Sequence, residues 1–130
     1  MLGERRITAL PATHTVPAVG YRLDSGRASL VFTGDTTTND DLWNELNKIT
    51  DLRYLVIETA FSNSDRQLAV MSKHLCPSML GDELKKLRHN PEIFITHLKP
   101  GRREITMQEI QENAGERKPR MLQNNQVFEF

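Results

Sequence analysis

The sequence of 130 residues lacks several features that mark specialised protein classes. It has one cysteine, Cys76, so no intramolecular disulfide can form and nothing points to an oxidising compartment. Its 17 basic and 17 acidic residues cancel, which removes any global argument for attraction to nucleic acid or to a membrane. Neither a membrane-length apolar run nor a charged-then-apolar leader is present. We therefore expect a cytoplasmic protein.

Short apolar runs alternate with segments of helical periodicity, which favours an α/β fold built as a single domain. Apolar alternation or short apolar runs between turn residues predict strands at 19–23, 28–32, 54–57, 93–96 and 127–130. The tight connection between the first two strands predicts a hairpin over residues 18–34. The last strand is expected at an edge of the sheet.

Capping signals and periodicity predict four helices. The first has Asn39 as its N-cap, and its apolar stripe places Trp43 in the core. Capping boxes at 64–67 and 106–109 are expected to start the second and fourth helices, and Pro77 opens the third. The predicted core-facing stripes are Leu68, Met71 and Leu75 in the second helix and Leu80, Leu84 and Leu87 in the third.

Asp35 is the carboxylate around which the chain is predicted to be organised. It follows the strand at 28–32, and Gly34 before it allows a sharp turn that points an acidic side chain into a crevice. Taken alone, this pattern favours an ordinary Asx-turn or helix N-cap. Two histidines change the interpretation, because His14 and His97 also stand where apolar segments give way to loops.

Histidines and an aspartate at the ends of separate strands are the ligands that a dinuclear divalent metal site needs. Imidazoles hold each ion, and a carboxylate bridges two ions about 3.5 to 4 Å apart. Such a pair lowers the pKa of a shared water towards ~7 and stabilises the oxyanion of a phosphate or acyl transition state. We therefore predict Asp35 as the bridging and catalytic ligand, and His14 and His97 as terminal ligands.

Further polar residues have alternative roles. His74, between two predicted helices, would orient a phosphate oxygen or protonate a leaving alkoxide, with capping of a helix carbonyl as an equal alternative. Glu58 ends a buried strand and would either support a ligand histidine or cap its loop. Lys99 would bind substrate phosphate, although a solvated loop is the safer interpretation. Cys76 is expected to be a small buried residue, and His89 a surface one.

Five segments together resemble a known family: residues 13–21 (THTVPAVGY), 32–36 (FTGDT), 56–63 (VIETAFSN), 72–75 (SKHL) and 95–100 (ITHLKP). In this order they are similar to the C-terminal half of the metallo-β-lactamase fold, and more narrowly to class II 3′,5′-cyclic-nucleotide phosphodiesterases. The resemblance spans about residues 10–105 of this chain. The tRNase Z group, which processes the 3′ ends of tRNA precursors, shows a similar order and is the alternative within the superfamily.

The resemblance implies half of an αββα sandwich, with a mixed sheet and flanking helices. It also implies a metal-dependent hydrolase that opens the cyclic phosphodiester of cyclic AMP or cyclic GMP. His14, Asp35 and His97 match metal-ligand positions of the family, and His74 matches a histidine that borders the substrate phosphate. The cofactor would be a divalent metal, zinc first, with two ions in the complete site and manganese, magnesium or iron as alternatives.

The sequence departs from the family in one large respect, because no His-x-His occurs in it. The superfamily's His-x-His-x-Asp-His block belongs to its N-terminal half. We therefore expect residues 1–130 to be one partial domain that is inactive alone and needs a missing segment or a partner. A homodimer would cover an open sheet face but would not supply the block. The alternatives are a tRNase Z-like ribonuclease, against which the balanced charge argues, and a non-catalytic binding or interaction module.

Overall fold

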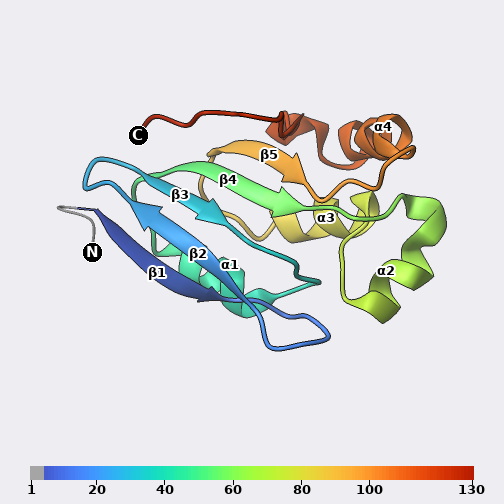
Figure 1. Cartoon of the computed structure of the whole chain (residues 1–130), viewed down its shortest axis with the longest axis horizontal. Coiled ribbons are helices and arrows are strands. Elements are labelled where there is room, and N and C mark those ends of the chain that lie inside the picture. Colours follow the sequence, from blue (N-terminus) through green and yellow to red (C-terminus); the bar gives the residue numbers. More distant parts are fainter. Residues whose placement is uncertain (1–4) are drawn as a thin grey trace.

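A computed structural model describes residues 5–130, which form one mixed six-stranded sheet with flanking helices (Figure 1). The strands lie side by side in chain order: β1 (Arg6–Pro11), β2 (Val19–Asp24), β3 (Ser29–Phe32), β4 (Leu52–Glu58), β5 (Glu92–Thr96) and β6 (Arg120–Met121). Pairing is antiparallel from β1 to β3 and parallel from β3 to β6. Consequently β1, β3, β4 and β5 all end at the same end of the sheet, where their loops meet.

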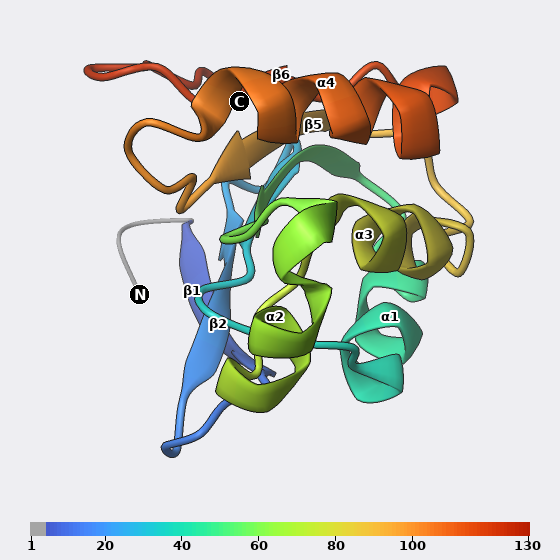
Figure 2. The same ribbon diagram turned by 90° about the vertical axis from the view of Figure 1, so that its right-hand side faces the viewer.

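The helices are α1 (Asp40–Asn47), α2 (Arg66–Ser72), α3 (Pro77–Leu84) and α4 (Arg103–Ala114), with short 3-10 turns at Asn63–Asp65 and Gly115–Arg117. Figure 2 shows α1, α2 and α3 on one side of the sheet, with α4 along the β5–β6 side. Asn39 caps α1 as predicted, since its Oδ1 accepts a hydrogen bond from the Leu42 amide at 3.2 Å. None of the described helices is long and apolar enough to cross a membrane.

The helix-covered face of the sheet forms the hydrophobic core. Its strand residues are essentially inaccessible to solvent: Val31, Leu55, Ile57, Ile93 and Ile95. Trp43 is buried against them as predicted, as are the three leucines of the predicted α3 stripe. The alternation of side chains along each strand assigns these residues to one face, so the next residues point to the other side.

The opposite face of the sheet is apolar but only partly covered. Register pairing of Tyr21 with Phe32, and of Phe32 with Val56, places these side chains together on it. Tyr21 is 44% exposed and Phe32 is 39% exposed. The C-terminal tail shields the β4–β5 part of this face, where the ring of Phe128 lies 5.0 Å from the rings of Tyr54 and Phe94. We call the exposed part, Ile7, Val19, Tyr21 and Phe32, the open face.

The hairpin and the strands around 54–57 and 93–96 are confirmed, but the predicted strand at 127–130 is wrong. The place beside β5 is taken by β6, which precedes a turn through Asn125, a residue in the left-handed region with φ of 61°. After this turn the aromatic side chains of the tail pack across the sheet face instead of extending its edge.

Both predicted capping boxes are wrong, because the Ser64 hydroxyl has other partners and Thr106 lies inside its helix. The Ser64 hydroxyl bonds with Ser62 Oγ at 2.9 Å and accepts from Arg102 Nη2 at 3.1 Å, and α2 starts two residues later. Helix α4 already starts at Arg103, so Thr106 lies inside it. The predicted stripe of the second helix is wrong for Leu68 and Met71, which are exposed, because Ala69 is the buried residue of α2. Leu75 is buried as predicted, but it lies beyond the end of α2.

Candidate metal centre

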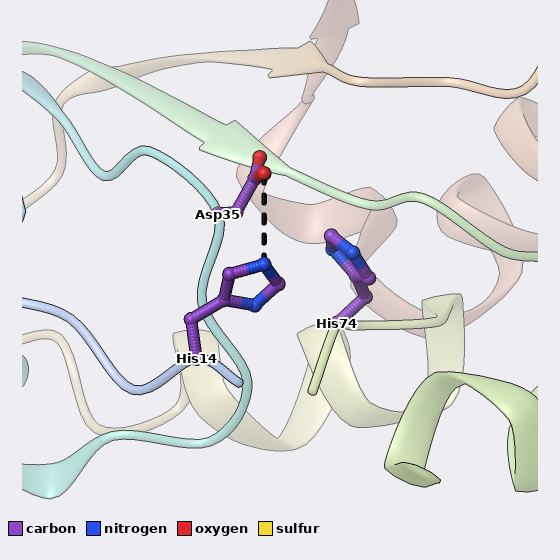
Figure 3. Close-up of side chains that lie close together, drawn as sticks. All are labelled: His14, Asp35 and His74. Atoms are coloured by element: carbon purple, nitrogen blue, oxygen red, sulfur yellow. Dashed lines mark ion pairs between the residues drawn. The ribbon is translucent and has the colours of Figure 1, made fainter. Parts of the chain in front are cut away.

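The loops at the shared end of the sheet bring together the residues that the sequence singled out. His14 lies in the loop after β1, Asp35 follows β3 and His97 follows β5. His74 enters from the connection between α2 and α3. Figure 3 shows His14, Asp35 and His74 pointing towards one another from three separate segments. The topology therefore unites side chains that are distant in sequence.

The four side chains form one cluster. His14 Nε2 lies 3.8 Å from Asp35 Oδ2, and His97 Nδ1 lies 3.9 Å from Asp35 Oδ1. The ring centroid of His74 lies 4.8 Å from that of His14 and 5.0 Å from that of His97. One potential ligand atom from each of His14, Asp35 and His74 falls within 4.8 Å of the others.

Asp35 and His97 form the solvent-facing side of the cluster. Their side chains are 43% and 40% exposed. His97 adopts a φ of 66°, in the left-handed region that a residue with a Cβ rarely occupies. Strain of this kind persists where the surrounding structure imposes it and is common at functional sites.

Glu58 forms the buried support of the cluster. Its side chain is fully buried, and Oε1 contacts His74 Nδ1 at 2.7 Å and accepts from the Thr36 amide at 3.1 Å. Oε2 accepts from the amides of Ala60 and Leu75, each at 3.2 Å. Four partners fill the acceptor capacity of a carboxylate. Glu58 therefore supports a histidine, but this is His74 and not one of the predicted ligands His14 and His97. It also holds its own loop through the Ala60 amide, as in the alternative prediction.

Burial shifts the pKa values of both Glu58 and His74. Burial raises the pKa of Glu58 to about 8, with a further upward contribution from the charge of Asp35, while the backbone hydrogen bonds oppose the rise. Burial also lowers the pKa of His74, and the neighbouring His97 adds to this effect. The 2.7 Å contact between Glu58 Oε1 and His74 Nδ1 requires one shared proton, so Glu58 occupies Nδ1 and the other ring nitrogen, Nε2, has no part in this bond.

A backbone carbonyl that sequence reasoning missed orients His14. Its Nδ1 donates to the Lys73 carbonyl oxygen at 3.0 Å, which leaves Nε2 facing Asp35. Lys73 ends α2 in the left-handed region, with φ of 58°. Support of this type fixes the tautomer and the ring orientation of a ligand histidine. A non-glycine residue in this conformation carries no sequence signal, so only the structure could identify it.

The remaining predicted residues lie in or near the site as follows. Lys99 stands at its rim, with Nζ 5.0 Å from the centroid of the Phe61 ring, which in turn lies 5.8 Å from the ring of His74. Cys76 is fully buried, as expected. His89 is away from the cluster and half-buried, where its Nε2 contacts the Asn47 carbonyl oxygen at 3.0 Å.

The donor set fits a divalent metal. Imidazole nitrogens and a carboxylate oxygen suit zinc and neighbouring transition metals, and both His14 and His74 have one nitrogen fixed by a partner and the other left over. His97 and Asp35 lie on the open side, where further ligands can enter. The residues present are therefore compatible with the predicted metal site.

Neither a protein-family model nor a curated protein matches the sequence. Among solved structures, the metallo-β-lactamase fold protein YhfI from Bacillus subtilis has a TM-score of 0.78 at 20% identity, over 98% of this chain and 50% of that chain. Unliganded yeast PDE1 has a TM-score of 0.74 at 16% identity, over 92% of this chain and 44% of that chain. The short form of human tRNase Z has a TM-score of 0.65 at 16% identity, over 92% of this chain and 39% of that chain.

These similarities span nearly all of this chain and half or less of each solved structure. They agree with the mixed sheet and flanking helices that were predicted from the five segments. The sheet and helices of this chain therefore have the fold of about half of the metallo-β-lactamase fold protein YhfI.

Proposed function

We propose that this chain is part of a metal-dependent phosphodiester hydrolase that acts on 3′,5′-cyclic nucleotides. The observation that carries the proposal is the meeting of three histidines and Asp35 at the shared end of β1, β3 and β5. The similarity to class II cyclic-nucleotide phosphodiesterases in five ordered segments supports the substrate. The similarity in fold to yeast PDE1 is consistent with it.

In this proposal His14, Asp35 and His97 hold the metal, as the resemblance implies. When bound, a divalent ion there would polarise a phosphoryl oxygen and acidify a water molecule. Asp35 presents one carboxylate oxygen to each of the two histidines, which suits a bridging role. Its exposed position leaves the metal-binding side open to a small phosphodiester.

His74 borders the substrate phosphate in the same proposal. Glu58 holds its Nδ1 and fixes the plane of the ring, so Nε2 is the atom that can give a proton to the leaving alkoxide. His74 also lies within the possible ligand group of His14 and Asp35, so a role as metal ligand is the alternative. Lys99, at the rim, adds positive charge where the phosphate would approach.

The open face supports the further proposal that a second α/β half completes the site. Ile7, Val19, Tyr21 and Phe32 lie on it partly exposed, and each Å² of apolar area left in water costs about 25 cal/mol. The matched structures are about twice as long as this chain or longer, so about as much additional chain, or more, accompanies the matched part in them. A segment or partner with an apolar sheet of its own would cover the open face and carry the absent His-x-His-x-Asp-His block.

A chimera tests the function. The part of Bacillus subtilis YhfI that this chain does not match would be joined to it, with the His-x-His-x-Asp-His block present, and loaded with zinc or manganese. We expect hydrolysis of cyclic AMP or cyclic GMP that is lost on Asp35→Ala. A folded, metal-loaded chimera without any phosphodiesterase activity rejects the proposal. Cleavage of a tRNA precursor, with no turnover of cyclic nucleotides, would instead assign the tRNase Z-type activity.

A further inference from the structure

We propose that Thr36 is a positioning residue that fixes the loop of His14 against the loop of Asp35, and both against Glu58. Its consequence for metal affinity rests on the proposed metal site, whereas the positioning itself does not. Thr36 is almost fully buried immediately after Asp35, although its neighbours along the loop are more accessible. A buried hydroxyl in a loop requires partners, and one partner of the Thr36 hydroxyl comes from the loop of His14.

The Thr36 side chain joins the two loops. Its Oγ1 accepts from the Thr13 amide at 3.0 Å, immediately before His14, and donates to the Thr37 carbonyl oxygen at 3.1 Å. In the reverse direction, the Thr37 amide donates to the Thr13 carbonyl oxygen at 2.9 Å. The residue before His14 is thus bonded twice to the residues after Asp35. We call these two bonds, Thr13 N to Thr36 Oγ1 and Thr37 N to Thr13 O, the loop clip.

The backbone of Thr36 links the loop clip to the third segment. Its amide donates to Glu58 Oε1 at 3.1 Å, and the same oxygen holds His74 Nδ1. A displacement of Thr36 would therefore move the loops of His14 and Asp35 and disturb the support of His74. One buried residue is connected to three of the four side chains of the cluster.

Asn39 fixes the end of β1, next to the loop clip, to the helical layer. Its Nδ2 donates to the Pro11 carbonyl oxygen at 3.0 Å, and its backbone amide donates to Glu83 Oε1 at 2.8 Å. Glu83 is buried on α3 and also accepts from Trp43 Nε1 at 3.0 Å. The end of β1 is therefore fixed to α1 and α3, and the remaining freedom of the His14 loop lies beyond Pro11, where the clip acts.

The chain offers a matched set of variants. Thr36→Val removes the hydroxyl at nearly constant volume and keeps the amide that binds Glu58. Thr59→Val is the control, because Thr59 is equally buried and its hydroxyl donates only to the adjacent Glu58 carbonyl oxygen, at 2.8 Å. Thr36→Ser restores the hydroxyl and should restore the behaviour of the unmodified chain.

The first readout needs no metal. Nuclear Overhauser effects between the ring protons of His14 and His74, whose centroids are 4.8 Å apart, report the position of the His14 loop. We expect them to disappear in Thr36→Val and to persist in Thr59→Val and Thr36→Ser. Their persistence in a folded Thr36→Val chain overturns the proposal. In the unmodified chain, rapid hydrogen exchange of both the Thr13 and Thr37 amides would overturn it as well, whether or not the variant folds.

The second readout is metal affinity by calorimetry with zinc. Loss of a group that orients a ligand typically costs 10- to 100-fold in affinity, and we expect a loss of that order in Thr36→Val alone. A loss of the same size in Thr59→Val overturns the specific role of Thr36. If the unmodified chain binds no zinc but the ring contacts still depend on the Thr36 hydroxyl, the positioning role stands and the proposed metal function fails.

Discussion

The two sides of the histidine cluster differ in how firmly they are held. On the inner side, Glu58 and His74 are buried, and Glu58 Oε1 lies 2.7 Å from His74 Nδ1. The Glu58 carboxylate also accepts hydrogen bonds from three backbone amides. On the outer side, Asp35 and His97 are each about two-fifths exposed, and the nearest oxygen and nitrogen atoms lie 3.9 Å apart. The inner side is organised as part of the fold, whereas the outer side presents donor atoms that the fold itself does not require. The outer side is therefore where binding energy for a ligand remains available.

The largest expected effect is on stability, at the inner side. Glu58→Ala leaves three buried amides and the His74 ring without their acceptor, so we expect a loss of roughly 3–5 kcal/mol in the free energy of unfolding. Asp35→Ala should change it by no more than about 0.5 kcal/mol, since its contacts are exposed and long. Urea unfolding of both variants makes the comparison. Equal losses would remove the distinction between the two sides.

Double-mutant cycles sharpen the comparison. The coupling free energy between Glu58 and His74, from Glu58→Gln and His74→Ala, should reach about 1–3 kcal/mol, because the bond is short and buried. The corresponding coupling between Asp35 and His97 should stay within about 0.5 kcal/mol. A larger coupling on the outer side would contradict the assignment.

The pH dependence of stability should also come from the inner side. The folded pKa of Glu58, about 8, lies above its ordinary value of 4.5, so the folded chain keeps a proton that the unfolded chain has lost. Stability from this group therefore falls as pH rises towards 8. The lowered pKa of His74 changes the pH dependence of stability only below about pH 6.5, because above that value the histidine is neutral in both the folded and the unfolded chain.

Between about pH 6.5 and 8, the free energy of unfolding should consequently fall by roughly 1–2 kcal/mol. Urea unfolding at intervals across this range measures the slope, and Glu58→Gln should flatten it. A rise in stability over the same range in the unmodified chain would show that Glu58 is ionised throughout.

The smallest expected effect is on the stability of the outer side, where the backbone of His97 is strained. His97→Gly relieves the left-handed backbone, for which a residue with a Cβ pays about 1 kcal/mol, so we expect a gain of about 0.5 kcal/mol after the added chain entropy. His97→Ala keeps the strain and loses only the ring, so it serves as the control. Thermal unfolding of both variants measures the difference, and a loss of stability in His97→Gly contradicts it.

The sequence predicted correctly those elements whose local pattern of residues is compatible with only one type of secondary structure. The β2–β3 hairpin, the buried runs of β4 and β5 and the Asn39 cap follow from periodicity and turn residues. The predicted strand at 127–130 failed because alternating aromatic residues suit a strand and a tail packed over a sheet face equally well. Ser64 failed as a cap because Ser62 and Arg102, the latter distant in sequence, engage its hydroxyl.

The candidate site also contains residues that the sequence identified and supporting groups that it did not. Asp35, His14 and His97 could be identified because each marks the end of an apolar segment, and the structure brings them together with His74. Their assignment as metal ligands remains a prediction. The carbonyl of Lys73 and the hydroxyl of Thr36 could not be identified, because their partners, His14 Nδ1 and the Thr13 amide, are set by tertiary packing. Sequence indicates which side chains carry the chemistry, and the structure adds the groups that orient them.

The most direct test of the metal site is calorimetry of zinc and manganese binding, with elemental analysis, on the unmodified chain and on His14→Ala, Asp35→Ala and His97→Ala. His89→Ala serves as the control, because His89 lies outside the cluster. We predict one ion per chain, with binding lost in the three cluster variants and unchanged in the control. No binding by the unmodified chain, or binding that is indifferent to the three substitutions, would contradict a metal site at this end of the sheet.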